Sequence, residues 1–194
     1  MTGKLSCFIA LSLTLLAGTF QTKPASPAPS FVRAPGQKFY LDLDTNEGNF
    51  SQWRHDELGS LTGLRATVSI PRVGRGPNFA AVFAFLLQES ESMNNGQVLG
   101  LQLGVFDNKD SFVFRVVHAK DGKPIQVETL QKRVDLNEKV NIAIDWATPG
   151  TVSIKVGETE MHRLDVAWSI QSVAVTASTG EMKVDPLVFG RVEP

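Results

Sequence analysis

Residues 140–156, VNIAIDWATPGTVSIKV, alternate apolar and polar side chains in two short runs on either side of a turn. The first run has its apolar residues in phase at Val140, Ile142, Ile144 and Trp146, and the second has them at Val152, Ile154 and Val156. A period of two places successive side chains on opposite faces of a β-strand, and Thr148-Pro149-Gly150 supplies the reversal. The segment therefore predicts a β-hairpin with one buried face and a packed Trp146.

The same period continues through the rest of the chain from Gln37 onward, and no stretch of ten or more residues sustains a helical pattern. Two segments, 79–87 (FAAVFAFLL) and 112–117 (FVFRVV), are apolar on both faces or nearly so, which is typical of central strands. Turn sequences such as Asp121-Gly122 separate neighbouring runs. We therefore expect an all-β, antiparallel sandwich of about eleven to thirteen strands.

Three segments are expected along the chain. In residues 1–21 a short basic start at Lys4 is followed by an apolar run that is too short to span a bilayer. This arrangement is typical of a secretory signal peptide. Residues 22–36 are rich in Pro, Ala and Ser and predict an extended tether, and residues 37–194 form the β domain. We expect a secreted or periplasmic protein with no membrane span once the leader is removed.

The cysteine content and the charge of the chain argue against several kinds of site. The single cysteine, Cys7, lies in the predicted leader, so the processed chain would have neither disulfides nor cysteine metal sites. The 19 basic and 20 acidic residues give a formal net charge of −1, without the basic surface that nucleic acids require. No nucleic-acid partner is expected.

The order of the predicted strands supports a family resemblance. A leading strand FYLDLD, a middle block of long strands, the hairpin with its I-D-W turn, and the closing segments SIQSVAVTAS and PLVFGRV follow one another. This order resembles the concanavalin A-like lectin and glucanase superfamily, which includes laminin-G-like domains. The resemblance implies a two-sheet antiparallel jelly-roll β-sandwich, with ligands on the concave sheet or in the loops at its rim. It leaves the activity open, because the family includes lectins, interaction domains, glycoside hydrolases and polysaccharide lyases.

Catalytic patterns of that family do not match this chain. The glucanase strand motif E-x-D-x-x-E is missing, and Glu89-Ser90-Glu91, which comes nearest to it, lies in a polar segment that predicts a loop. The three histidines, His55, His118 and His162, lack the spacing that places two imidazoles on one strand face, which argues against a zinc site. An enzyme could still use Glu89, Glu91 or Asp145 in a non-standard carboxylate site.

Calcium is the one cofactor with a partial sequence signal. Asp42, Asp44 and Asn46 alternate as in a calcium loop, but Gly48 is one place late and no glutamate stands at position 53. A looser calcium site at the sheet rim could add Glu47. We otherwise expect no cofactor.

Candidate ligand-binding residues come from exposed aromatic and polar side chains, because sugar rings stack on aromatic faces and hydrogen-bond with polar groups. Trp53, Trp168 and Tyr40 are the available aromatic platforms, and Trp53 has the most polar neighbours. Half-buried packing is the alternative role for Trp53. The predicted set is Trp53, Arg54, Asp56, Glu89, Glu91, Asn94 and Asn95.

Three functions remain open from the sequence. The first is an exported, non-catalytic recognition module that binds carbohydrate or a cell-surface polymer, and the failure of each catalytic pattern favours it. The second is a carbohydrate-active enzyme, either a glycoside hydrolase or a polysaccharide lyase. The third is a structural or protein-interaction domain without a small ligand.

Overall fold

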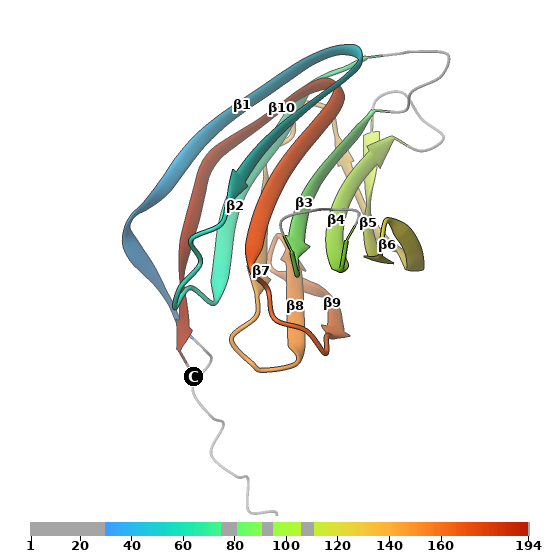
Figure 1. Ribbon diagram of the computed structural model, residues 1–194. Helices are drawn as coiled ribbons and strands as arrows, with labels where there is room; N and C mark the ends of the chain where they lie inside the picture. Colours follow the sequence, from blue (N-terminus) through green and yellow to red (C-terminus); the bar gives the residue numbers. More distant parts are fainter. Residues whose placement is uncertain (1–29, 75–80, 91–94, 106–110, 194) are drawn as a thin grey trace, which may run out of the picture.

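The computed structural model describes residues 30–74, 81–90, 95–105 and 111–193, and within them every regular element is a β-strand (Figure 1). The ten strands are β1 (Ser30–His55), β2 (Gly63–Val73), β3 (Val82–Gln88), β4 (Gln97–Val105), β5 (Ser111–Lys120), β6 (Lys123–Asp135), β7 (Val140–Asp145), β8 (Thr151–Val156), β9 (Thr159–Asp165) and β10 (Ser172–Glu193). This described part of the chain contains no helix of the length and hydrophobicity needed to cross a membrane.

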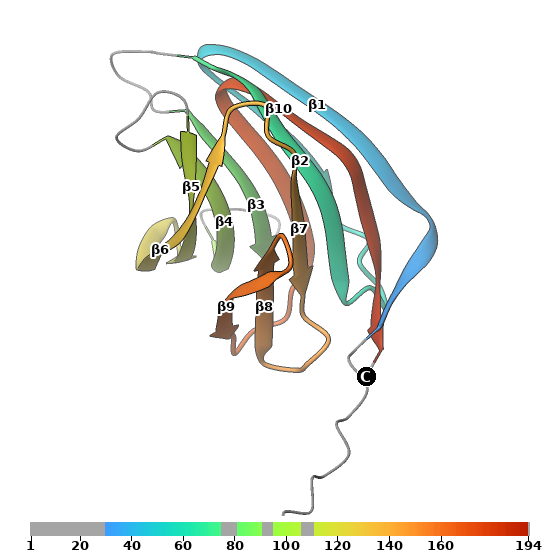
Figure 2. The same ribbon diagram turned by 180° about the vertical axis from the view of Figure 1, so that it is seen from behind.

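The strands form one antiparallel network in the order β6-β5-β4-β3-β10-β2-β7-β8-β9, with β1 paired along β10. The first part of β10 pairs with β3 and the part after Thr179 pairs with β2, so β10 belongs to two layers, as does β1 (Figures 1 and 2). We name the layers the β3–β6 layer and the β7–β9 layer; the latter includes β2. The result is the predicted antiparallel jelly-roll β-sandwich.

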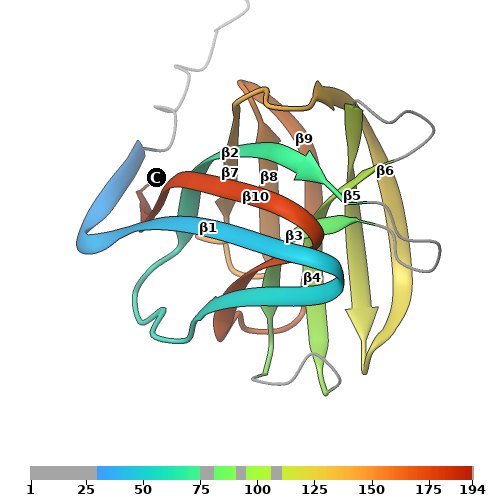
Figure 3. The same cartoon turned by 90° about the horizontal axis from the view of Figure 1, so that it is seen from above.

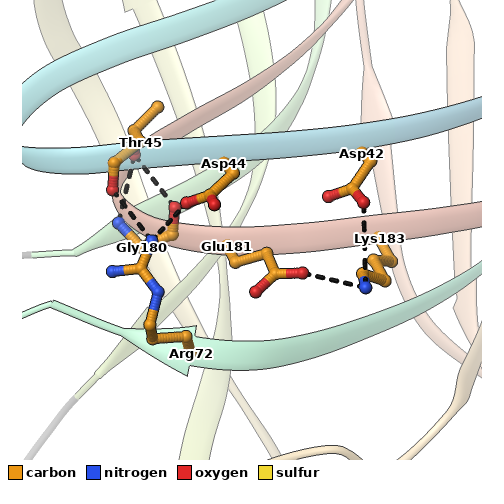
Figure 4. A network of polar contacts seen from close by, with 7 residues as sticks. All are labelled: Asp42, Asp44, Thr45, Arg72, Gly180, Glu181 and Lys183. Atoms are coloured by element: carbon orange, nitrogen blue, oxygen red, sulfur yellow. Dashed lines mark hydrogen bonds and ion pairs between the residues drawn. The ribbon is translucent and has the colours of Figure 1, made fainter.

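β1 and β10 run side by side from one layer into the other, as the view from above shows (Figure 3). At this crossing the Thr45 hydroxyl donates to the Gly180 carbonyl at 3.0 Å and accepts from the Gly180 amide at 3.1 Å (Figure 4). Arg72 of β2 pairs with Asp44 and donates to the Thr45 carbonyl at 3.3 Å. A Cβ at Gly180 would lie 2.8 Å from the Phe83 ring, so only glycine fits there.

The hairpin of residues 140–156 is confirmed as β7 and β8. The six alternating aliphatic side chains predicted to share its inner face are all buried. Trp146 lies just after β7, packs against the core, and donates from Nε1 to the Leu61 carbonyl at 3.0 Å. Phenylalanines fill much of the space between the layers, with Phe83, Phe85, Phe112, Phe114 and Phe189 fully buried.

Strand number and the first strand differ from the sequence prediction. The described residues form ten strands rather than eleven to thirteen, in part because β10 runs through two segments, SIQSVAVTAS and PLVFGRV, that predict separate strands. β1 already begins at Ser30, inside the expected tether 22–36, and Ser30 pairs with Glu193. Gly36, at a φ of 75°, lies where the register shifts between Arg33 and Lys38, a bulge that accommodates Pro35. The predicted leader 1–21 lies outside the described residues.

Candidate functional site

The outer face of the β3–β6 layer carries a row of side chains that crosses six strands. Directly paired residues of neighbouring strands point to the same face, and they alternate with the core residues. This row, named the polar row, consists of Gln52, Thr176, Ala84, Gln102, Arg115 and Thr129. The next row along the strands consists of Arg54, Ala174, Leu86, Gly100, Val117 and Val127.

The middle of this face is built from small residues. Ala84 is 2% exposed, Ala174 0% and Thr176 4%, and the two alanines pack with Leu86 and Val98 into a small buried cluster on this face. Longer neighbours such as Gln102 and Arg115 are half-buried on the same face. The centre of the face is therefore closely packed, and amide and guanidinium groups lie beside it.

A chain of polar contacts closes one end of the face. Arg54 pairs with Asp56 through Nε and donates from Nη2 to the Ser172 hydroxyl at 3.1 Å. That hydroxyl donates to Oε1 of Gln88 at 3.2 Å. Gln88 is fully buried, and its Nε2 has no hydrogen-bond partner among the described residues. An unpaired buried amide costs about 1–3 kcal/mol, so the Nε2 group of Gln88 lowers the stability of the fold at this point.

Apolar side chains stand exposed on both edge strands of the layer. Phe50 on β1 is 55% exposed and Val127 on β6 is 52% exposed. Phe50 pairs with Ser178, which places it on the outer face one row from Gln52. The face thus combines polar groups with an exposed aromatic ring at one edge.

Comparison with known proteins identifies the fold. The sequence shows no match to a protein-family model or to a curated protein. The structure is similar to an endo-acting O-glycanase of the human gut microbiota, with a TM-score of 0.58 and 13% identity over 78% of this chain and 79% of that one. It is also similar to the galectin LEC-6 of Caenorhabditis elegans, with a TM-score of 0.54 and 12% identity over 80% and 97% of the two chains. This chain has a concanavalin A-like fold.

A third similar structure is a Bacteroides ovatus GH16 protein of a mixed-linkage glucan locus, with a TM-score of 0.52 and 10% identity over 83% of this chain and 84% of that one. At such identities the likeness establishes the concanavalin A-like fold alone. The site must be argued from this chain's own residues.

Trp53 faces away from the outer face of the concanavalin A-like sandwich. It pairs with the core residue Val175, one position from Arg54, and alternation sends the two side chains to opposite faces. Its ring lies 4.8 Å from that of Phe39 and stacks on His55 at 5.9 Å. The structure therefore brings Arg54 and Asp56 together and separates Trp53 from them. Ligand binding by Trp53 stays a prediction.

Glu89 lies in the turn between β3 and β4, and its carboxylate is hydrogen-bonded there. Its Oε2 accepts from the Gln97 amide at 2.8 Å, and Asp121 accepts from the Gly96 amide at 2.9 Å. Ser90 donates to the carbonyl of Asn95, whose side chain is exposed. Glu89 and Asn95 therefore belong to the turn between β3 and β4. Glu91 and Asn94 lie outside the described residues.

Two of this chain's three candidate catalytic carboxylates, Asp145 and Glu89, are described, and they lie in different layers. Asp145 pairs with Arg65 on the β7–β9 layer, whereas Glu89 lies at the end of β3 in the other layer. A retaining glycosidase needs two carboxyls about 5–5.5 Å apart. Asp145 and Glu89 do not form such a pair.

The two aspartates of the predicted calcium site, Asp42 and Asp44, each lie beside a basic side chain. Asp44 pairs with Arg72, and Asp42 lies 3.7 Å from Nζ of Lys183 (Figure 4). The hydrogen bond to Glu181, with the charge of Asp42, raises the pKa of Lys183 above its usual value. Asn46 is exposed, and the side chain of Glu47 lies outside the described ones. Over the described residues no three acidic, histidine or cysteine side chains are grouped to hold a metal.

Sequence reasoning missed most of the polar row. Gln102 and Arg115 each occupy an outward position in an alternating strand, which is an ordinary pattern for any sheet surface. Pairing across β4 and β5 places them side by side. The interruption of the apolar run 112–117 by Arg115 was the one available signal.

Proposed function

We propose that this protein is an exported, non-catalytic recognition module that binds carbohydrate through the outer face of the β3–β6 layer. The observation that carries the proposal is the polar row, which brings amide, hydroxyl and guanidinium groups from separate strands onto one face. The amides of Gln52 and Gln102 and the Thr176 hydroxyl both donate and accept, and Arg115 adds donors. Sugar hydroxyls need both kinds of partner, and Ala84 lies between Thr176 and Gln102 in the row.

Support for the ligand class comes from the names of the similar structures. They describe a galectin, an O-glycanase that acts on mucin, and a GH16 protein bound to a glucan product. A carbohydrate therefore fits both the fold and the groups on this face. The predicted signal peptide at residues 1–21 supports export.

The residues of the face favour binding over hydrolysis. Neither the polar row nor the row beside it contains an aspartate or a glutamate. Glycoside hydrolysis by the usual two mechanisms needs a pair of carboxyl groups flanking the bond. A sugar lying across this face would meet donors and acceptors without a catalytic pair.

Affinity electrophoresis through gels containing mixed-linkage β-glucan, mucin or cellulose derivatives tests the proposal. We expect retardation in at least one gel and a loss of about tenfold in affinity, near 1.4 kcal/mol, on replacing Gln102 and Arg115 together by alanine. Arg163→Ala, which removes an exposed arginine of β9, is the matched control and should bind normally. Unretarded wild-type protein, or a double variant that binds fully, would overturn the binding face. Release of reducing ends would overturn the non-catalytic assignment.

A further inference from the structure

A hollow of about 390 Å³ lies on the outer face of the opposite layer. Strands β2, β7, β8 and β10 and the turn after β8 line it, and the residues that matter are Arg65, Thr67, Asn141, Ala143, Lys155 and Glu158. The volume falls within the range of about 300–1,000 Å³ typical of small-ligand sites. This hollow is separate from the polar row, which faces outward from the β3–β6 layer.

The hollow exists because a small residue stands between two long ones. Arg65 pairs with Ala143, and Ala143 pairs with Lys155, so the three lie in one row across β2, β7 and β8. Neighbouring strands are about 4.8 Å apart, which places the two cationic residues about 10 Å from each other across a methyl floor. Val188 and Pro186 of β10 extend the apolar part of the floor.

The Arg65 side chain is held in place at one side of the hollow. It holds both carboxylate oxygens of Asp145, and Nη1 donates to the Leu64 carbonyl at 2.8 Å. Its guanidinium lies 4.2 Å above the Phe31 ring. These contacts fix the side chain before any ligand arrives, which lowers the entropy cost of binding.

The other polar groups of the hollow are less engaged. Thr67 donates to Oδ1 of Asn141 at 2.9 Å, which orients the Asn141 amide N–H groups as donors. Within the described part of the chain, neither Lys155 nor Glu158 has an ion-pair partner. The hollow therefore offers two sets of free donors and a carboxylate acceptor around an apolar floor.

We infer that this hollow is a second saccharide-binding site, which takes an uncharged sugar unit. The charges cancel, since Asp145 balances Arg65 and Glu158 balances Lys155, so there is no excess cation for an acidic ligand. A purely apolar ligand would leave Asn141, Lys155 and Glu158 unpaired, at a cost in affinity. A sugar offers hydroxyls to all three and a C–H face to Ala143.

An exposed aromatic ring extends the site. Tyr40 is 63% exposed and lies on β1 between Phe39 and Leu41, which pack against the core. Alternation therefore turns it outward, where β10 carries Pro186 at the edge of the hollow. The Nζ of Lys38 lies over this ring, 4.9 Å from its centroid, so a second sugar unit would stack on the opposite face of the ring or displace the Lys38 ammonium. With sites on both layers, one molecule could join two glycan chains.

Amide chemical shifts of the ¹⁵N-labelled protein, titrated in turn with glucose, galactose, mannose and N-acetylglucosamine, and separately with the acidic sugar glucuronate, test this inference. At least one sugar should shift amides within residues 141–158, and Asn141→Ala with Lys155→Ala should remove those shifts. Gln102→Ala with Arg115→Ala is the control, which should leave them unchanged. The second site is overturned if none of the four sugars shifts residues 141–158, or if glucuronate alone does. Shifts at Gln102 and Arg115 report separately on the proposed function.

Discussion

Arg65 of β2 reaches diagonally to the neighbouring strand β7 and holds both carboxylate oxygens of Asp145. Its own pairing partner on β7 is Ala143, while Asp145 pairs with Gly63. A Cβ at Gly63 would lie 2.7 Å from Oδ1 of Asp145, so glycine makes the room that the ion pair needs. Both side chains are partly buried, with 32% of Arg65 and 16% of Asp145 exposed.

Asp145→Ala should lower the free energy of unfolding by about 1–3 kcal/mol, because it leaves the Arg65 guanidinium partly buried without its anion. Urea denaturation of Asp145→Ala, Arg65→Ala and the double variant measures the coupling between the two side chains. We expect the double variant to lose less than the sum of the single losses. Strictly additive losses would show that the pair does not act as a unit.

Gly190→Ala should destabilise the protein far more than Gly100→Ala. A Cβ at Gly190 would meet the Val32 carbonyl and come within 2.6 Å of the Phe31 ring, so β1 would have to move. At Gly100 the nearest atom is the mobile Cδ2 of Leu86 at 3.0 Å. We expect a loss of about 1–3 kcal/mol for Gly190→Ala and less than half of that for Gly100→Ala in urea unfolding. Equal losses would contradict the close packing of β1 on β10.

Trp53→Ala tests the packing role against the sequence-based prediction of ligand binding. Because the ring contacts Phe39, His55 and Phe189, its loss should cost about 2–4 kcal/mol of stability. Trp53→Phe should recover most of that loss and retain carbohydrate binding. A stable Trp53→Ala protein that has lost binding would instead support Trp53 as a ligand contact.

The free energy of unfolding should decrease as the pH falls, because His118 is harder to protonate in the folded protein than in the unfolded chain. Burial lowers the pKa of this imidazole from its usual 6.5, while its Nε2 lies 3.0 Å from Oε1 of Gln97. Below about pH 6.5 the unfolded chain therefore binds more protons than the folded one, and the stability present above that pH is lost as the pH falls toward the folded value. Urea unfolding between about pH 7.5 and about pH 5 should show a shallower decline for His118→Gln. Parallel curves would exclude a contribution from His118.

Local alternation predicted which residues face the core, and pairing between distant segments determined the site. The hairpin 140–156 could be predicted because its faces depend on a period within one strand. Gln52, Thr176 and Gln102 come from remote parts of the chain, and only the strand order places them in one row. Trp53 shows the limit of local evidence. Its polar neighbours suggested exposure, yet Phe39, fourteen positions earlier on the same long strand, packs against it.

A crystal structure with an oligosaccharide of the polymer that most strongly retards the protein tests the central claim most directly. We predict a sugar unit on the outer face of the β3–β6 layer, hydrogen-bonded to Gln102 and Arg115 above Ala84. A sugar bound only at Trp53 or at the β3–β4 turn, with the polar row left bare, would contradict the account.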